Sequence, residues 1–362
     1  MSEVRLGDLI DFKNGKSIQK SEGMIPIYGG NGVLGYTDDF NFSNAVVIGR
    51  VGAYCGSIHV SKGECWVSDN AIAAIPKTDI NIDYVYYLLK MLNLNSLHIG
   101  SSQPLITQSM LSNLTVNFET DFFKQSQIVN ILNLIDSKIA INNQINQELE
   151  AMAKTLFDYW FVQFDFPDEN GQPYKSSGGK MVYNDQLKRE IPEGWEVEKL
   201  GDFLTIRNGK DHKSLHDGDI CVYGSGGLMR TVDTAIYESQ SILIPRKGTL
   251  NNVMYVNEAF WTVDTMFYSE IKKENSALFV YYSIKDIDFL KLNTGTGVPS
   301  MTSSILYSLN IISPDSSLYE RFDEVCSVYY KITKKNSEQN QELAQFRDWL
   351  LPMLMNGQVK VD

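Results

Sequence analysis

The chain has 362 residues, of which 43% are hydrophobic and 21% charged, and its formal net charge is −12. This length predicts two or three globular domains with sizeable cores, and the ordinary composition argues against a disordered or disulfide-stapled class. The acidic balance excludes a uniformly basic domain, so any surface for a polyanion must be a local concentration of Lys and Arg.

The sequence favours the cytoplasm and gives no sign of a membrane segment. It has no run of about 18 apolar residues, and the first stretch, MSEVRLGDLIDFKNG, lacks the basic and apolar regions of a signal peptide. Cys55, Cys65, Cys221 and Cys326 stand at unrelated spacings, which predicts reduced thiols. His212 and His216 near Cys221 lack a fourth ligand at a sensible spacing, so we expect no metal site.

In chain order, the first notable stretch is LGDLIDFKNGK at Leu6–Lys16, because LGDFLTIRNGK follows 194 positions later at Leu200–Lys210. Further pairs keep the same order with slips of one residue. They are IPIYGGNG and ICVYGSGG, AVVIGRVG and SILIPRKG, SSQPLIT and TGVPSMT, and two copies of NQEL. The chain is therefore predicted to be a tandem duplication of one large unit, with pseudo-two-fold symmetry.

Each copy begins with a globular part and ends with a long helix. Residues 1–120, here called head 1, and residues 197–315, head 2, contain short β-rich runs between Gly- and Asn-rich turns, plus one helical segment each. The predicted fold class is therefore α+β, with two mixed α/β domains. Residues 166–196 are rich in Gly, Pro, Ser and charge and are expected to form a linker.

The helices are expected at residues 121–165 and 316–362 as an antiparallel coiled coil. Their predicted contact positions alternate in steps of three and four. In the first helix they are Ile128, Ile131, Ile135, Lys138, Asn142, Ile145, Leu149, Met152, Leu156 and Tyr159; in the second they are Phe322, Val325, Tyr329, Ile332, Asn336, Gln339, Leu343, Phe346, Leu350 and Met353. Asn142 and Asn336 are equivalent, and we expect them to lie close together and fix the register.

Catalytic motifs are weak throughout the chain. The GKS at Gly15–Ser17 lacks the first Gly of a phosphate loop, since Ile10 stands there, and the second copy reads GKD. No PP dipeptide occurs, so the Pro-Pro motif of amino-methyltransferases is missing. We therefore assign no catalytic residue and no cofactor to this chain.

The layout of head, long helix, linker, head and long helix resembles the specificity (S) subunit of type I restriction-modification systems. LFDYWFVQFDFP at Leu156–Pro167 is similar to the central conserved region of that family, and FRDWLLPMLMNGQV at Phe346–Val359 to its C-terminal conserved region. LIPRKGTLNNVMYV and GSSQPLIT resemble stretches of its target recognition domains. The resemblance covers nearly the whole chain.

This resemblance implies a non-catalytic subunit whose heads are target recognition domains. Each would read one half of a split target in double-stranded DNA, and the helices would set the spacer. Two methyltransferase (M) subunits would dock around the helices, and restriction (R) subunits would complete the nuclease. S-adenosylmethionine, ATP and Mg would belong to those partner subunits.

Residue chemistry suggests which side chains contact DNA, because Lys, Arg and small hydroxyls bind phosphates while Arg, Lys, Asn and Gln read base edges. The candidates are Asn14, Lys16, Asn31, Arg50, Ser101, Ser102 and Gln103 in head 1, and Arg207, Asn208, Lys210, Arg230, Arg246, Lys247, Thr249 and Thr296 in head 2. For any one of them, an ordinary surface or turn residue remains the alternative.

The aromatic and apolar residues at the helix ends exceed the needs of two packed helices. The predicted partner-binding residues are Phe157, Trp160, Phe161, Phe346, Trp349, Leu350 and Leu354, and the alternative is packing onto the heads. Two other functions stay open: a specificity subunit of a type IIB-like or modification-only system, and a coiled-coil scaffold that binds protein.

Overall fold

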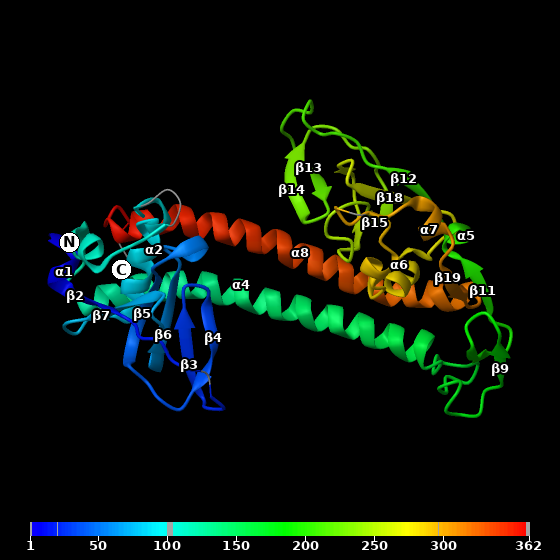
Figure 1. Ribbon diagram of the computed structural model, residues 1–362, viewed down its shortest axis with the longest axis horizontal. Helices are drawn as coiled ribbons and strands as arrows, with labels where there is room; N and C mark the ends of the chain where they lie inside the picture. The colour runs from blue at the N-terminus through cyan, green and yellow to red at the C-terminus, as the bar shows by residue number, and fades with distance from the viewer. Residues whose placement is uncertain (1, 20, 100–103, 296, 360–362) are drawn as a thin grey trace. The chain divides into compact units, whose positions relative to one another are not determined.

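The computed structural model describes residues 2–19, 21–99, 104–295 and 297–359. The chain divides into two compact units: unit 1 comprises Met1–Asn143 with Ser337–Asp362, and unit 2 comprises Gln144–Asn336. Strands and helices are mixed in both units, which confirms the predicted α+β class (Figure 1). Each of the two longest helices contributes one part to each unit.

Unit 1 contains the whole of head 1. Its elements in chain order are β1 (Ser2–Arg5), α1 (Leu6–Leu9), β2 (Ile10–Asn14), β3 (Ile25–Gly29), β4 (Gly32–Thr37), β5 (Phe42–Gly49), η1 (Gly52–Tyr54), β6 (Ile58–Val67), β7 (Ala71–Pro76), α2 (Ile82–Met91), η2 (Leu94–Ser96), α3 (Gln108–Asn113), β8 (Thr115–Phe118) and the first part of α4 (Phe122–Phe157). The end of α8 (Ser316–Met355) also belongs to this unit.

The centre of unit 1 is a six-stranded sheet in the order β2-β7-β5-β6-β3-β4. All pairings are antiparallel except that of β3 with β6. Side chains alternate along β5, so Val46 and Ile48 join the core shared with the helices, while Ala45 and Val47 join a smaller core with Cys65. Both faces of this central strand are therefore buried, as its unbroken apolar run requires.

Unit 2 contains head 2 and the remaining parts of both long helices. After α4 come η3 (Asp158–Val162), β9 (Met181–Asn184), β10 (Arg189–Pro192), β11 (Glu196–Lys199), α5 (Leu200–Phe203), β12 (Leu204–Asn208), β13 (Ile220–Gly224), β14 (Gly227–Val232), β15 (Gln240–Pro245), β16 (Met254–Asn257), β17 (Phe260–Thr262), β18 (Met266–Ile271), α6 (Ala277–Lys285), η4 (Phe289–Leu292), α7 (Ser303–Tyr307), β19 (Asn310–Ser313) and α8.

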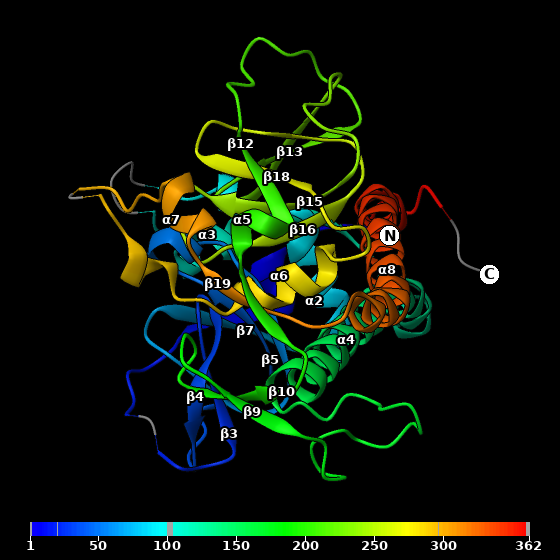
Figure 2. The ribbon, with the colours of Figure 1, turned by 90° about the vertical axis from the view of Figure 1, so that its right-hand side faces the viewer.

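The sheets of unit 2 repeat the pairings of unit 1. A four-stranded sheet has the order β12-β18-β15-β16, and a three-stranded sheet has the order β14-β13-β17. As in unit 1, the hairpin strand β13 pairs parallel with the strand that carries the Trp. Figure 2 shows α6 beside β15 and β16, and its apolar face closes the larger core of this unit.

The segment expected to be a linker has structure of its own. It forms the antiparallel hairpin β9–β10, with Ile191 almost fully buried. Phe166 stacks on Tyr174 and Trp195 at centroid distances of 4.7 and 5.0 Å. Asp165 accepts hydrogen bonds from the backbone N–H and hydroxyl of Ser176, which lower the pKa of its carboxyl group. Aromatic stacking and local capping thus order a stretch whose composition is typical of a loop.

Within unit 1, α4 and α8 pack antiparallel. Asn142 is fully buried and donates from Nδ2 to Gln339 Oε1 and Asn340 Oδ1, both at 2.9 Å. Further toward the head, Arg347 Nη1 lies 2.7 Å from Asp136 Oδ1. The side chains at the contact are Ile128, Leu132, Ile135, Ile139 and Asn142 of α4 and Asn340, Leu343, Arg347, Leu350 and Leu354 of α8.

Within unit 2, the other parts of the two helices make the matching contact. Asn336 Nδ2 donates to Asn146 Oδ1 at 2.9 Å. The side chains involved are Asn146, Leu149, Ala153 and Leu156 of α4, Trp160 of η3, and Phe322, Cys326, Tyr329, Thr333 and Asn336 of α8. Each α4 position in this contact has its α8 counterpart in unit 1, 194 residues later.

These contacts correct the predicted phase of the helices. The buried positions step by four and then three, so Leu132, Ala153 and Trp160 are buried rather than Ile131, Met152 and Tyr159. Met152 is 50% exposed and Phe346 49%. Asn142 and Asn336 make no hydrogen bond to each other, because Asn142 donates to Asn340 and Asn336 donates to Asn146.

Candidate nucleic-acid interface

The tripeptide Asn-Gly-Lys begins at the last residue of β2 in head 1 and of β12 in head 2, and it is held in the same way in both heads. In head 1, Lys16 N–H donates to the Val67 carbonyl at 3.0 Å, and the Trp66 indole N–H donates to the Lys16 carbonyl at 2.7 Å. Gly15 lies so close to the turn that follows β6 that an added Cβ would be 2.0 Å from the Ser68 carbonyl oxygen. Only glycine fits at this position.

In head 2 the same three contacts recur. Lys210 N–H donates to the Thr262 carbonyl at 2.9 Å, and the Trp261 indole N–H donates to the Lys210 carbonyl at 3.0 Å. A Cβ on Gly209 would lie 2.1 Å from the Val263 carbonyl oxygen. The turn is thus fixed by backbone contacts, and the exposed Lys16 and Lys210 side chains extend from it.

A second loop, after β5 in head 1 and β15 in head 2, flanks the same part of each head. Arg50 N–H donates to the Asn70 carbonyl and Arg246 N–H to the Thr265 carbonyl. The Arg50 and Arg246 carbonyls accept from Ile106 and Met301. Arg50 and Arg246 therefore lie beside the turn to which Gly15 and Gly209 are bound.

The same loop contacts a further segment of each head, around Pro104 and Pro299. Gly52 N–H donates to the Pro104 carbonyl, and Gly248 N–H donates to the Pro299 carbonyl, each at 3.1 Å. The predicted DNA-binding residues that adjoin this segment in the sequence are Ser101, Ser102, Gln103 and Thr296, and all four lie outside the described residues.

Each hairpin tip, between β3 and β4 or between β13 and β14, also packs against this loop. In head 1 a Cβ on Gly30 would be 3.3 Å from Tyr54 Cβ, and Asn31 is exposed at the tip. In head 2 Asn252 Nδ2 donates to the Ser225 carbonyl at 3.0 Å. The tip, the loop and the Asn-Gly-Lys turn thus come together from three distant parts of each head.

Two of the predicted arginines are occupied by carboxylates. Arg207 makes a bidentate pair with Glu270 at 2.9 and 3.1 Å, and this hydrogen bonding raises the pKa of its guanidinium group. Arg230 pairs with Asp217 at 3.1 Å. These pairs are weak at the surface and can exchange for phosphate, but they make both arginines poorer candidates than their sequence neighbours.

The other described candidates are more available. Asn14, Lys16 and Asn31 in head 1, and Asn208, Lys210, Lys247 and Thr249 in head 2, have exposed side chains. Within the described ranges, neither Lys16 nor Lys210 has a carboxylate at ion-pair distance. Arg246 stacks on Phe267 at 5.8 Å, and Arg50 has its Nε buried with no hydrogen-bond partner among the described atoms.

The predicted partner-binding residues separate into two groups. Phe157, Trp160 and Phe161 are at most 8% exposed in the core of unit 2, and Leu350 and Leu354 are buried in unit 1. These five are corrected to core residues, because the ends of the long helices pack onto the heads. Phe346 and Trp349 are exposed and stack on each other at 5.9 Å.

Exposed apolar side chains also recur along the parts of the long helices that belong to each unit. In unit 1 they are Leu134 and Ile141 with Phe346 and Trp349; in unit 2 they are Ile145, Met152, Val325, Val328 and Ile332. We call these residues the outer stripe. A stripe of this kind on long helices is typical of a surface covered by another protein.

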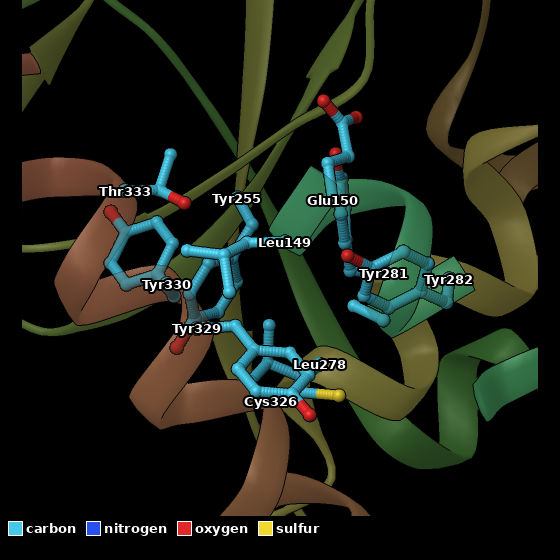
Figure 3. Close-up of a pocket in the computed structure, with 11 residues that line it drawn as sticks. Leu149, Glu150, Tyr255, Leu278, Tyr281, Tyr282, Cys326, Tyr329, Tyr330 and Thr333 are labelled. Carbon is cyan, nitrogen blue, oxygen red and sulfur yellow. The ribbon is translucent and has the colours of Figure 1, made fainter. Parts of the chain in front are cut away.

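A tyrosine-lined pocket lies in unit 2, where α4, α6 and α8 meet β16 (Figure 3). Its volume is about 190 Å³, and Tyr255, Tyr281 and Tyr330 are among its lining residues. Glu150 at its edge is paired with Lys285, which lies over the Tyr281 ring at 5.4 Å. The cation position of this aromatic cluster is therefore already taken by a side chain of the chain itself.

The described residues contain no group of His, Cys, Asp and Glu that could hold a metal ion. Cys55, Cys65 and Cys326 are buried free thiols. Among the described helices, none combines the length and the apolar character needed to cross a bilayer.

The model of one protein family, the type I restriction modification DNA specificity domain, matches residues 1–151 and 192–344. The chain belongs to this family. The two matched stretches each contain one head and most of one long helix, so the specificity domain family accounts for both copies of the duplication. The function is accordingly that of a DNA sequence-specificity subunit.

Relatives of the specificity domain family cover most of the chain. It is 25% identical to the type I restriction enzyme MjaIX specificity subunit of Methanocaldococcus jannaschii, over 85% of this chain and 76% of that protein. It is 26% identical to the type I restriction enzyme HindI specificity subunit of Haemophilus influenzae, over 71% of each.

A solved structure of a family member shows the same fold. The crystal structure of the S subunit of a type I restriction-modification system from M. genitalium matches with a TM-score of 0.66 and 19% identity, over 98% of this chain and 96% of that chain.

Sequence reasoning missed two sets of residues in this specificity subunit. Trp66 and Trp261 are 195 positions apart in the two copies, but nothing local in the sequence shows that their indoles bind the Asn-Gly-Lys turn. Asn146 and Asn340 are the asparagines of the repeated NQEL, and their place in the helix contact could have been found by testing both phases of the 3.5-residue period.

Proposed function

We propose that each head reads one half of a bipartite target in double-stranded DNA and that the chain itself is non-catalytic. The observation that carries this proposal is the shared framework: the Asn-Gly-Lys turn and the following loop are held by equivalent contacts in both heads. The exposed side chains differ, because Asn31, Lys247 and Thr249 correspond to Gly226, Val51 and Ala53 in the other head. One scaffold with different exposed side chains suits two half-sites of different sequence.

The long helices are proposed to form an antiparallel coiled coil that sets the spacer between the half-sites. The alternating steps of four and three support this, as does the constant offset of 194 residues between equivalent contact positions. The same offset supports a pseudo-two-fold relation between the copies. DNA periodicity favours half-sites about one turn, or roughly 34 Å, apart.

The outer stripe is proposed to dock two methyltransferase subunits, with restriction subunits joining the assembly. Phe346 and Trp349 are the predicted partner-binding residues that remain exposed, and stacked aromatic side chains are typical anchors of protein interfaces. S-adenosylmethionine, ATP and Mg are proposed to be bound by these partners rather than by this chain.

Methylome sequencing of the host with and without the intact coding sequence tests this function. We expect a bipartite methylated motif that disappears on deletion and returns on complementation. An unchanged methylome would contradict the proposal and favour a scaffold that binds protein. A motif that is methylated, while unmodified copies of it are never cleaved, would assign the chain to a modification-only system.

A further inference from the structure

The Asn-Gly-Lys turn is the surface element that the two heads share most completely. Asn14-Gly15-Lys16 and Asn208-Gly209-Lys210 are identical in sequence, and each begins at the last residue of a strand at the edge of its sheet. The neighbouring hairpin tips differ, since Gly30 and Asn31 correspond to Ser225 and Gly226. The surface therefore has a constant part and a variable part.

The constant part is also held by the same contacts in both heads. Three contacts hold each turn: the Lys N–H on a strand carbonyl, the Trp indole N–H on the Lys carbonyl, and a Gly pressed against the next turn. These contacts fix the backbone position of each Lys, and its ammonium group has no carboxylate partner among the described residues. A Lys on a fixed backbone is a suitable point charge for a phosphate.

Heads that read different half-sites must differ where they contact bases, but every half-site offers the same phosphates. We propose, on the basis of the proposed function, that Lys16 and Lys210 bind backbone phosphates, and that Trp66 and Trp261 are positioning residues for them. Base reading then belongs to the variable side chains, among them Asn31, Lys247 and Thr249.

Binding of the complete complex to its target, and to single-base variants of that target, at several salt concentrations tests the assignment. Lys16→Gln should weaken binding to all these DNAs about five- to tenfold at 0.1 M salt, and lower the salt slope by about 0.9, the value for one lost phosphate contact. The ranking of the base variants should not change. Lys16→Arg should restore both affinity and slope.

The Trp variant separates positioning from folding. Trp66→Phe keeps one aromatic ring but removes the indole N–H, so we expect a smaller, sequence-independent loss of affinity with a lower salt slope. Because Trp66 is partly exposed, the melting temperature of this variant should fall only slightly. Trp261→Phe should weaken binding in the same way in head 2, with a larger fall in melting temperature because Trp261 is only 8% exposed. Lys62→Gln is the matched control, because Lys62 carries the same charge in head 1 but is paired with Asp83 at 2.8 Å; it should leave the slope unchanged.

Two results would overturn the assignment while leaving the proposed function intact. One is a changed base preference in Lys16→Gln, which would make Lys16 a base reader. The other is unaltered binding and slope in both Lys16→Gln and Lys210→Gln. Failure of the unmodified complex to select any sequence would instead contradict the proposed function itself.

Discussion

At the scale of single residues, burial separates side chains that look alike in the sequence. Phe161 is 3% exposed and contacts Phe279, Phe322 and Trp195, whereas Trp349 is 57% exposed and stacks only on Phe346 among the described rings. Both residues belong to the aromatic helix ends that resemble the conserved regions of the family. Their roles differ because Phe161 packs into the core of head 2, whereas the Trp349 side chain is not covered by head 1.

This difference predicts opposite effects on stability. Phe161→Ala should lower the free energy of unfolding by about 3–5 kcal/mol, because it leaves a cavity among aromatic rings. Trp349→Ala should change it by less than about 0.5 kcal/mol, as for other exposed sites. Urea unfolding of the two variants, followed by circular dichroism, measures both values. Equal destabilisation would contradict the assignment of Trp349 to an open surface.

Asp323 on α8 gives the chain a predicted pH dependence. Burial raises the pKa of its carboxyl group from 3.8 to about 6, with Lys331 opposing the shift and Glu324 adding to it. Its Oδ1 is buried without a hydrogen-bond partner among the described atoms. The folded state therefore binds this proton more tightly than the unfolded state, and the group favours folding only while it is protonated.

The direction of the pH effect follows because the pKa of Asp323 is higher in the folded chain than in the unfolded chain. The contribution of Asp323 to stability should fall as the pH rises from about 4 to about 6 and stay low above that. Asp323→Asn removes the titration, so its advantage over the unmodified chain should grow across this window. Melting temperatures of both proteins between pH 4.5 and 7.5 measure the difference, and parallel curves would contradict it.

At the scale of elements, the long helices have two apolar stripes with the same 3.5-residue period. One stripe contains Leu132 and the other Leu134, which are 0% and 72% exposed. The predicted phase mixed positions of both stripes. The asparagines confirm the corrected phase, since Asn142 and Asn146 each donate or accept across the helix pair of their own unit.

The two leucines provide a matched test of the corrected phase. Leu132→Ala should cost about 2–5 kcal/mol of unfolding free energy, as for a fully buried leucine. Leu134→Ala, the same change two residues away on the same helix, should cost less than about 0.5 kcal/mol. Denaturant midpoints of the pair test the corrected phase. A larger loss in Leu134→Ala than in Leu132→Ala would contradict it.

At the scale of the whole molecule, the duplication places two versions of one reading surface in a single chain. The net charge of −12 does not exclude DNA binding, because the side chains of Lys16, Lys210 and Lys247 are exposed. Arg207 and Arg230 contribute less positive charge, since Glu270 and Asp217 neutralise them. The surface is therefore less basic than its Lys and Arg content suggests. We propose that specificity comes from exposed side chains that differ between the heads.

Substitutions in one head should accordingly affect one half of the target. Asn31→Ala is expected to relax base preference in one half-site by about 1–3 kcal/mol, and Lys247→Ala in the other, because each bidentate or close base contact contributes about that much. The methylated motif of cells that carry each variant shows which half has become degenerate. Relaxation of both halves by either single change would contradict independent reading.

The sequence by itself determined the duplication, the α+β class, the existence of both long helices and the family, because these depend on local patterns and collinear repeats. Only the tertiary structure decided which helix stripe is buried, which arginines are neutralised, and which aromatic residues are core. The physical reason is the range of the interactions. A helix carries its period locally, but Leu132 is buried by α8, Arg207 is paired by a neighbouring strand, and Trp66 binds Lys16 from 50 positions away.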